Sequence, residues 1–317
     1  AVFHSVMFAF TRVTIPYHKG IFSKMAANFW LSTHCKYWLL TKEELVISAG
    51  RQEDLKYLTA EEYQKVHILF ANFIQALGEH LKHRQQVIAA ATQYFKRFYS
   101  KNSLKNIDPL LLAPTCLYLA SKVEENGVIS NNRLIQTCAT VVKNKFYAVF
   151  SGEYPFRINQ VYECEFFILE TMNCCLILYH PYRSLTQYVR DMSEDDNFLS
   201  LAWRIVNDSL RTDVCLLYPP YQIALAAIYM ACVVRSKDPC EFFKELCVDM
   251  DKILEITQEI LKLYEILKSY DEKKEMPTIL GKAPKPKTSS RPSSSASSNS
   301  QYLSQSPAVS SQAGTPR

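Results

Sequence analysis

The chain has 317 residues, 48% of them hydrophobic, which is enough for about two domains with substantial cores. No apolar stretch approaches the length of a membrane-spanning helix. The net charge of +5 comes from the two ends, because residues 1–24 and 276–317 hold eight Lys and Arg residues and no acid. The body between them has 28 basic residues against 31 acids, a net charge of −3, which argues against nucleic-acid binding as the main role.

The first 24 residues, which precede Met25, are basic, aromatic and free of acids. A transit peptide has this composition, but translated sequence upstream of a start at Met25 is the interpretation we favour. A helical segment over residues 25–58 is expected to follow this leader.

The first clear helix begins at Thr59-x-x-Glu62, a capping box in which each side chain bonds the other's backbone N–H. Apolar residues then recur at helical spacing as far as Leu77. Four more helices are predicted at about 84–100, from Asp108–Pro109 onward, from Ser130 or Asn131 onward, and at 157–173. Pro114 lies inside the helix that starts at Asp108–Pro109, so that helix is either kinked or begins after Pro109.

The pattern then recurs. The run DPLLLAPTCLYLASKVEE aligns with YPPYQIALAAIYMACVVRS at an offset of 111 residues, which puts Pro109 on Pro220. Five helices are again predicted, near 182–191, 197–212, 219–235, 239–247 and 251–270. The sequence therefore predicts an all-α fold with two tandem five-helix repeats, residues 59–175 and 176–275.

The C-terminal segment 276–317 is rich in Ser, Pro and Gln and is predicted to be a disordered tail. Its KAPKPK run is a weak nuclear-localisation signal and is equally expected of a solvated basic tail. Ser306 and Thr315 precede prolines and are candidate sites of proline-directed phosphorylation.

The segment LASKVEE, residues 119–125, ends the central helix of the first repeat. Lys122 suits a last turn, where the helix macrodipole is negative, whereas Glu124 and Glu125 each cost about 0.3–1 kcal/mol there. The second repeat reads VVRS at the corresponding positions, 233–236. Because only one repeat has the acids, the fold does not need them, and they are candidates for binding another molecule.

A second charge is out of place in the predicted helix 157–173. One stripe at helical spacing contains Val161, Cys164, Glu165, Ile168 and Met172. A carboxylate on a buried stripe must find a partner or change its protonation. Glu165 either lies at the edge of the stripe and pairs locally, or it pairs with a cation elsewhere in the repeat, for which Lys122 is the best candidate.

Signatures of catalysis are missing: the chain has no GxGxxG, Walker loop, HExxH or nucleophile elbow, and only seven glycines. Cys174 and Cys175 with His180 lack a second ligand pair at zinc spacing. The ten cysteines form no CxxC pair and mostly lie in apolar helical patterns, typical of reduced, buried thiols. We expect a non-catalytic interaction protein without metal or cofactor. His67 and the other histidines do not cluster and are expected at solvated or edge positions.

Ordered runs along the body resemble the cyclin family, and within it the cyclin of the Mediator kinase module. They include QALGEHLK, RQQVIA, YFKRFY, LAPTCLYLASKVEE, ECEFF, YHPYR, LAWRIVND, CLLYPP and ILKLYE, between Met25 and about Lys287. The resemblance implies that each repeat is a cyclin box. It also implies a nuclear regulatory subunit that activates a cyclin-dependent kinase and so regulates transcription by RNA polymerase II.

The resemblance assigns roles to the charges. In cyclins a Lys and a Glu of the first box contact the kinase's mobile helix, and by motif these are Lys122 and Glu165. The acids that match Glu124 and Glu125 are expected to face kinase arginines near the activation segment. Asn126 departs from the family, since an aromatic residue often stands there.

The resemblance also implies a groove for a second partner, the Mediator subunit that activates the kinase. Its expected residues are Trp203, Asn207 and Asp208 in one helix, with Tyr264. The same polar groups could instead cap or satisfy the core. The hydrophobic docking motif of cell-cycle cyclins, MRAIL, is absent, because the corresponding helix reads YQKVHILFANFIQAL.

Two other functions belong to the same fold. A cyclin of another transcriptional kinase would lack the runs quoted above. A TFIIB-type transcription factor would add a zinc ribbon and basic surfaces, whereas this chain has no CxxC pair and an acidic body. Neither direct nucleic-acid binding nor a membrane partner is expected.

Overall fold

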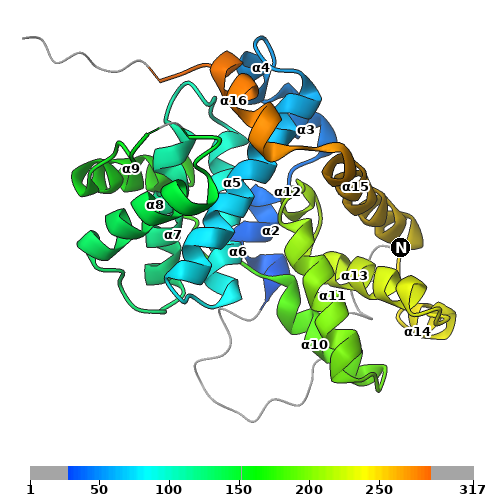
Figure 1. Cartoon of the computed structure of the whole chain (residues 1–317). Helices are drawn as coiled ribbons and strands as arrows, with labels where there is room; N and C mark the ends of the chain where they lie inside the picture. Colours follow the sequence, from blue (N-terminus) through cyan, green and yellow to red (C-terminus); the bar gives the residue numbers. More distant parts are fainter. Residues whose placement is uncertain (1–27, 151, 287–317) are drawn as a thin grey trace, which may run out of the picture. The chain divides into compact units, whose positions relative to one another are not determined.

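The computed structural model describes residues 28–150 and 152–286. Within these ranges it contains helices and no strand (Figure 1), which confirms the all-α prediction. The predicted leader 1–24 lies outside the described residues, and so do both candidate phosphorylation sites of the tail.

Four short helices come first: η1 (Phe29–Leu31), α2 (Thr33–Trp38), α3 (Lys42–Ile47) and α4 (Ala49–Asp54). Distant residues hold this segment in place. The backbone N–H of Leu40 donates to the Leu216 carbonyl at 2.8 Å, and the buried Asp54 carboxylate accepts from Ser103 and from the Leu104 N–H. The segment therefore packs on both halves of the chain.

The first bundle consists of α5 (Ala60–His80), α6 (Gln85–Tyr99), α7 (Pro109–Val123), α8 (Asn131–Lys145) and α9 (Ile158–Thr171). The capping box of α5 is present, with the Glu62 N–H donating to Thr59 Oγ1 at 3.1 Å and the return bond at 2.9 Å. Asp108 caps α7, which begins at Pro109 and continues through Pro114. Of the two alternatives for this helix, a start after Pro109 is therefore wrong.

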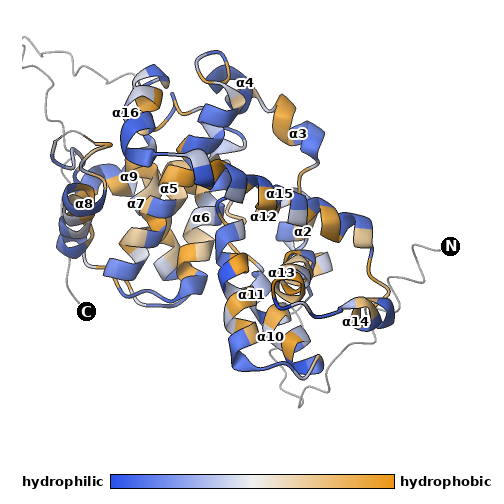
Figure 2. Cartoon of the chain, turned by 45° about the vertical axis from the view of Figure 1, so that its right-hand side comes forward, coloured by the Kyte–Doolittle hydropathy of each residue, from blue (hydrophilic) through white to orange (hydrophobic). Residues whose placement is uncertain are grey.

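The second bundle consists of α10 (Pro181–Asp191), α11 (Asp196–Ser209), the single turn α12 (Val214–Leu217), α13 (Pro220–Val234), α14 (Cys240–Glu245) and α15 (Met250–Ser269). The central helices α7 and α13 start and end at positions that differ by 111 residues, the offset of the sequence repeat. Both begin with proline, and both are apolar around most of their circumference, as the orange of α13 in Figure 2 shows.

The last helix, α16 (Glu272–Lys282), corrects the predicted start of the disordered tail at residue 276. Met276 and Ile279 are buried in the core of the first bundle. Ion pairs tie the helix to α5, with Glu275 2.7 Å from Lys65 and Lys282 2.7 Å from Glu62. Local sequence signals do not predict α16, because the helix contains Pro277 and packs on a helix 200 residues away.

Charged groups join the two bundles. Lys96 of α6 is buried, and its ammonium lies 3.0 Å from Asp213, just before α12; Arg51 of α4 lies 3.4 Å from the same carboxylate. Burial by itself would raise the pKa of Asp213, but the charges of Lys96 and Arg51 hold it well below its usual range. Asp213 therefore connects the second bundle to α4 and α6 through two ion pairs.

Two expectations about side chains need correction. His67 is not at a solvated edge: it is buried on α5 beside Tyr63, with ring centroids 4.5 Å apart, and burial lowers its pKa to about 3. It is therefore neutral at physiological pH. All ten cysteines are free, but only five are buried, while Cys174, Cys240 and Cys247 are exposed.

Candidate functional site

The end of α7 is a tight left-handed turn. Glu124 is the C-cap residue, and Glu125 after it has a φ of +50°. The Asn126 N–H donates to the Ser121 carbonyl at 3.0 Å, the six-to-one bond of a Schellman motif. Glycine normally fills the left-handed position, since other residues are strained there by about 1 kcal/mol or more.

The second bundle repeats this turn at the end of α13. Ser236 has a φ of +54°, and the Lys237 N–H donates to the Cys232 carbonyl at 2.9 Å. The backbone turn is therefore a property of the fold. The acidic side chains of Glu124 and Glu125 are not, as the sequence comparison of the two repeats indicated.

Lys122 and Glu165 form an ion pair between α7 and α9. The Glu165 side chain is 13% exposed and the Lys122 side chain 33%. The Lys122 ammonium also lies 4.4 Å from the centroid of the Tyr118 ring, a cation–π contact. Of the two alternatives for Glu165, the structure therefore shows pairing with Lys122 rather than with a neighbour on its own helix.

The second bundle has no such pair at the corresponding positions. The buried stripe of α9 matches that of α15 when Val161 is placed on Ile253, which puts Thr257 in the place of Glu165. Thr257 is buried and donates to the Ile253 carbonyl at 2.9 Å. Val233 takes the place of Lys122 and is 60% exposed. A bundle of this kind therefore packs well without the two charges.

The acids at the turn differ in their surroundings. The Glu124 carboxylate lies 3.9 Å from His180 Nε2, at the start of α10, and its side chain is 25% exposed. Glu125 points into solvent and is exposed. Asn126, the departure from the family pattern, contacts His83 Nδ1 at 2.6 Å and so closes the turn within this chain.

Exposed apolar side chains lie close to the members of the ion pair in the sequence. Phe166 and Phe167, the two residues after Glu165, are 72% and 52% exposed, and Val128 is 70% exposed. Sequence analysis missed the two phenylalanines, although their place off the buried stripe was a signal. An ion pair and carboxylates next to uncovered aromatic rings are typical of a protein-binding surface. We call this surface the α7–α9 corner: Lys122, Glu124, Glu125, Glu165, Phe166 and Phe167.

The four residues predicted for the second groove also come together. Tyr264 of α15 donates its hydroxyl to Asp208 at 3.0 Å. The Asn207 side chain accepts from the Tyr182 hydroxyl at 2.8 Å, and the Tyr182 ring lies 4.4 Å from that of Trp203. All four predicted residues are partly exposed, so the polar groups are held in place and still reachable from solvent. We call these four residues the α11–α15 groove, after the groove that the resemblance implies at them.

Two other kinds of site receive no support. Among the described residues, no group of three His, Cys, Asp or Glu side chains could hold a metal ion, and this includes Cys174, Cys175 and His180. Over the same part of the chain, no helix combines the length and apolar composition that crossing a membrane requires.

The two halves of the sequence match two family models. Residues 36–177 match the family described as "Cyclin, N-terminal domain", and residues 180–269 match the "Cyclin C-terminal domain". The chain is 61% identical over 263 residues to "Cyclin-C" of Rattus norvegicus, covering 83% of this chain and 92% of that protein. It is 60% identical over 264 residues to "Cyclin-C" of Drosophila melanogaster, covering 83% and 98%. "Cyclin-C1-1" of Oryza sativa subsp. japonica is 42% identical over 244 residues, covering 77% and 91%.

Solved structures share the fold. A chain in the CAK complex of Chaetomium thermophilum bound to ATP-γ-S superposes with a TM-score of 0.61 at 18% identity, covering 80% of this chain and 87% of that chain. A chain in the yeast TFIIK complex superposes with a TM-score of 0.55 at 24% identity, covering 73% and 100%. At these identities the likeness concerns the fold alone.

Proposed function

Because the chain belongs to the cyclin family, we propose that it is the regulatory subunit of a cyclin-dependent protein kinase. The relatives named Cyclin-C extend the proposal to the kinase of the Mediator kinase module, in the nucleus, where the complex regulates transcription by RNA polymerase II. The observation that carries it is the asymmetry of the two bundles. Only the first combines the Lys122–Glu165 pair with acids at the end of its central helix.

The α7–α9 corner supports a specific way of activating a kinase. A kinase is active when its mobile helix is held inward, so that a helix glutamate pairs with the lysine that aligns ATP. Lys122 and Glu165 hold each other in position before binding and are partly exposed, so they can contact that helix with little loss of side-chain entropy. Phe166 and Phe167 would lose their exposure to water in the same contact. The chain contributes no catalytic residue; its effect is on the kinase's conformation.

Glu124 and Glu125 would meet arginines near the kinase activation segment. A carboxylate paired with arginine in a desolvated interface contributes about 1.5–3 kcal/mol per hydrogen bond, roughly one to two decades in affinity. The test is a titration of the kinase with the Glu124→Gln, Glu125→Gln double variant. The proposal predicts weaker binding and lower kinase activity, while the melting temperature of the isolated chain is unchanged or slightly higher. Unchanged affinity and activity would mean that the two acids are ordinary solvated residues at the end of a helix, with no role in kinase binding.

We propose that the α11–α15 groove binds the Mediator subunit that activates the kinase. A partly exposed Trp203 beside Asp208 and Asn207 offers the aromatic and short polar groups that recur at binding hot spots. Asn207→Ala with Asp208→Ala should leave kinase binding intact and weaken binding of the activating subunit. If the double variant loses binding of the kinase and of the activating subunit equally, the chain is misfolded and this assignment is contradicted.

A further inference from the structure

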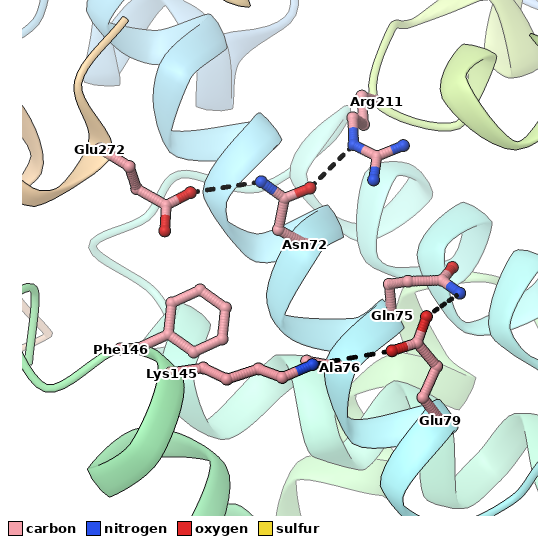
Figure 3. Close-up of a pocket in the computed structure, with 8 residues that line it drawn as sticks. All are labelled: Asn72, Gln75, Ala76, Glu79, Lys145, Phe146, Arg211 and Glu272. Carbon is pink, nitrogen blue, oxygen red and sulfur yellow. Dashed lines mark hydrogen bonds and ion pairs between the residues drawn. The ribbon is translucent and has the colours of Figure 1, made fainter.

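A cavity of about 260 Å³ opens where the two bundles and α16 meet (Figure 3). Its walls come from α5, the end of α8, the first turn of α16 and the loop after α11. In Figure 3, Glu272 and Phe146 lie on one side of the space, with Glu272 directed at Asn72 of α5, while Lys145 extends toward Glu79. The complete lining is Asn72, Gln75, Ala76, Glu79, Lys145, Phe146, Arg211 and Glu272.

The cations that line the cavity already have partners. Arg211 donates from Nε to the Asn72 side chain at 2.8 Å and from Nη1 to Asp208 at 3.1 Å. Lys145 lies 3.7 Å from the Glu79 carboxylate. Each of these cations is therefore balanced by an acid.

Glu272 is the acid left over. Its carboxylate accepts one hydrogen bond from the Asn72 amide at 3.2 Å and forms no ion pair with any residue that the structure describes. Burial raises the pKa of Glu272, and the bond from Asn72 and the more distant charge of Arg211 only partly oppose this. A partly desolvated carboxylate that faces an open cavity is a site for a cation.

The remaining walls favour a flat, extended cation. Phe146 and Ala76 are apolar and each only 4% exposed, and the Gln75 amide oxygen, which accepts a hydrogen bond from Gln85 at 3.0 Å, keeps a second lone pair. A guanidinium can stack on an aromatic ring and donate in parallel to a carboxylate and an amide, whereas an ammonium is compact and more strongly hydrated. We propose that this cavity binds a basic side chain, arginine before lysine, from the partner segment that occupies the α11–α15 groove.

The source of that side chain follows from continuity. Arg211 lines the cavity and bonds Asp208 of the groove, so the two sites are neighbours and a segment seated in the groove can reach the cavity. One ion pair alone holds a free ligand only at millimolar concentrations. A segment anchored next to the site raises the local concentration to the millimolar range, where such a contact is populated. The assignment of the source, though not of the cavity's chemistry, rests on the function proposed for the groove.

The chemistry is tested on the full chain without any partner. The probe is Nα-acetyl-arginine amide, with Nα-acetyl-citrulline amide as its neutral match, titrated to tens of millimolar while NMR follows the side-chain amides of Asn72 and Gln75. The arginine probe should shift both signals and bind about tenfold more tightly than citrulline. Glu272→Gln should weaken arginine binding about tenfold. The control Glu241→Gln, also in the first turn of a helix, should leave it unchanged. Equal binding of the two probes, or undiminished binding to the Glu272 variant, overturns the proposal.

The source is tested with the activating subunit. Glu272→Gln should weaken its binding several-fold, and Asn207→Ala with Asp208→Ala should weaken it further. Loss in the groove variant without any loss in Glu272→Gln overturns the cavity assignment and leaves the groove standing. If neither variant weakens binding of the activating subunit, the function proposed for the groove is wrong, and so is the proposed source of the basic side chain. A chain that ends at Pro286 and binds the arginine probe more tightly than the full chain would identify the chain's own tail as the occupant instead.

Discussion

Glu125 combines a strained backbone with an exposed charge. Its φ of +50° is matched by that of Ser236 at the equivalent turn of the second bundle, so the two positions form a natural pair for comparison. Either residue replaced by glycine should release strain and raise the free energy of unfolding by up to about 1 kcal/mol.

The two glycine variants should differ in kinase binding. Glu125→Gly removes a charge from the α7–α9 corner and should weaken the kinase complex, whereas Ser236→Gly should bind as the parent does. Chemical denaturation and a kinase titration on each variant measure the two effects separately. Weakening of the complex by Ser236→Gly as well would mean that the turn backbone, rather than the acid, governs binding.

Asp213 makes stability depend on pH. Its pKa is depressed in the folded chain, so its contribution is present above the unfolded value near 4 and is lost as the pH falls through that value toward the folded one. Asp213→Asn leaves the buried Lys96 without its counter-charge and should cost about 2 kcal/mol at pH 7. This is less than for a fully buried pair, because the Asp213 side chain is 33% exposed.

The difference between the Asp213 variant and the parent should shrink as the pH falls below about 4, because Asp213 of the unfolded parent then binds a proton while Asp213 of the folded parent stays ionised, which favours the unfolded state of the parent. Urea unfolding from pH 3 to 7 gives both curves, with the exposed Asp191→Asn as control. A difference that stays constant over this range would contradict the role of the ion pair.

At the scale of single residues, sequence reasoning identified the unusual charges where the two repeats could be compared. Glu165 stood out on an apolar stripe, and Lys122, at the end of the central helix of the same repeat, was the best candidate for its partner. The Lys96–Asp213 pair was missed because its members are 117 residues apart and no local pattern marks either one.

At the scale of helices, caps and periodicity predicted the ten main helices of the two bundles to within a few residues. The capping box at Thr59, the proline at position 109 and the repeat itself are local signals. The helix α16 had no comparable signal, because its buried face is completed by α5. The cavity beside it could not be predicted, since it exists only where α5, α8 and α16 meet Arg211.

The packing of α16 predicts a measurable contribution to stability. Met276 is fully buried in the first core, so Met276→Ala should lower the free energy of unfolding by about 2–4 kcal/mol through lost apolar burial and the cavity left behind. Leu254→Ala, at a site that is 39% exposed on α15, should cost much less. Denaturant unfolding of the two variants tests this, and equal small losses would show that α16 does not belong to the folded core.

Across the whole molecule, the two bundles share one architecture and differ in charge. The central helices agree at an offset of 111 residues, and their C-terminal turns have the same backbone. The first bundle carries an ion pair and acids where the second has Val233, Thr257, Arg235 and Ser236. This contrast separates the residues that the fold requires from those that it does not, and it supports the central proposal, that the charges of the first bundle serve kinase binding.

The most direct measurement transplants the residues of the second bundle into the first. Lys122→Ala alone should lower the melting temperature by several degrees, because Glu165 then lies 13% exposed without its counter-charge. Lys122→Val with Glu165→Thr should restore the melting temperature to within about two degrees of the parent, because Val233 and Thr257 already fill these places in the second bundle. The account predicts that this double variant, although stable, binds the kinase at least tenfold more weakly and activates it less. A double variant that is stable and binds and activates the kinase as the parent does would contradict the account.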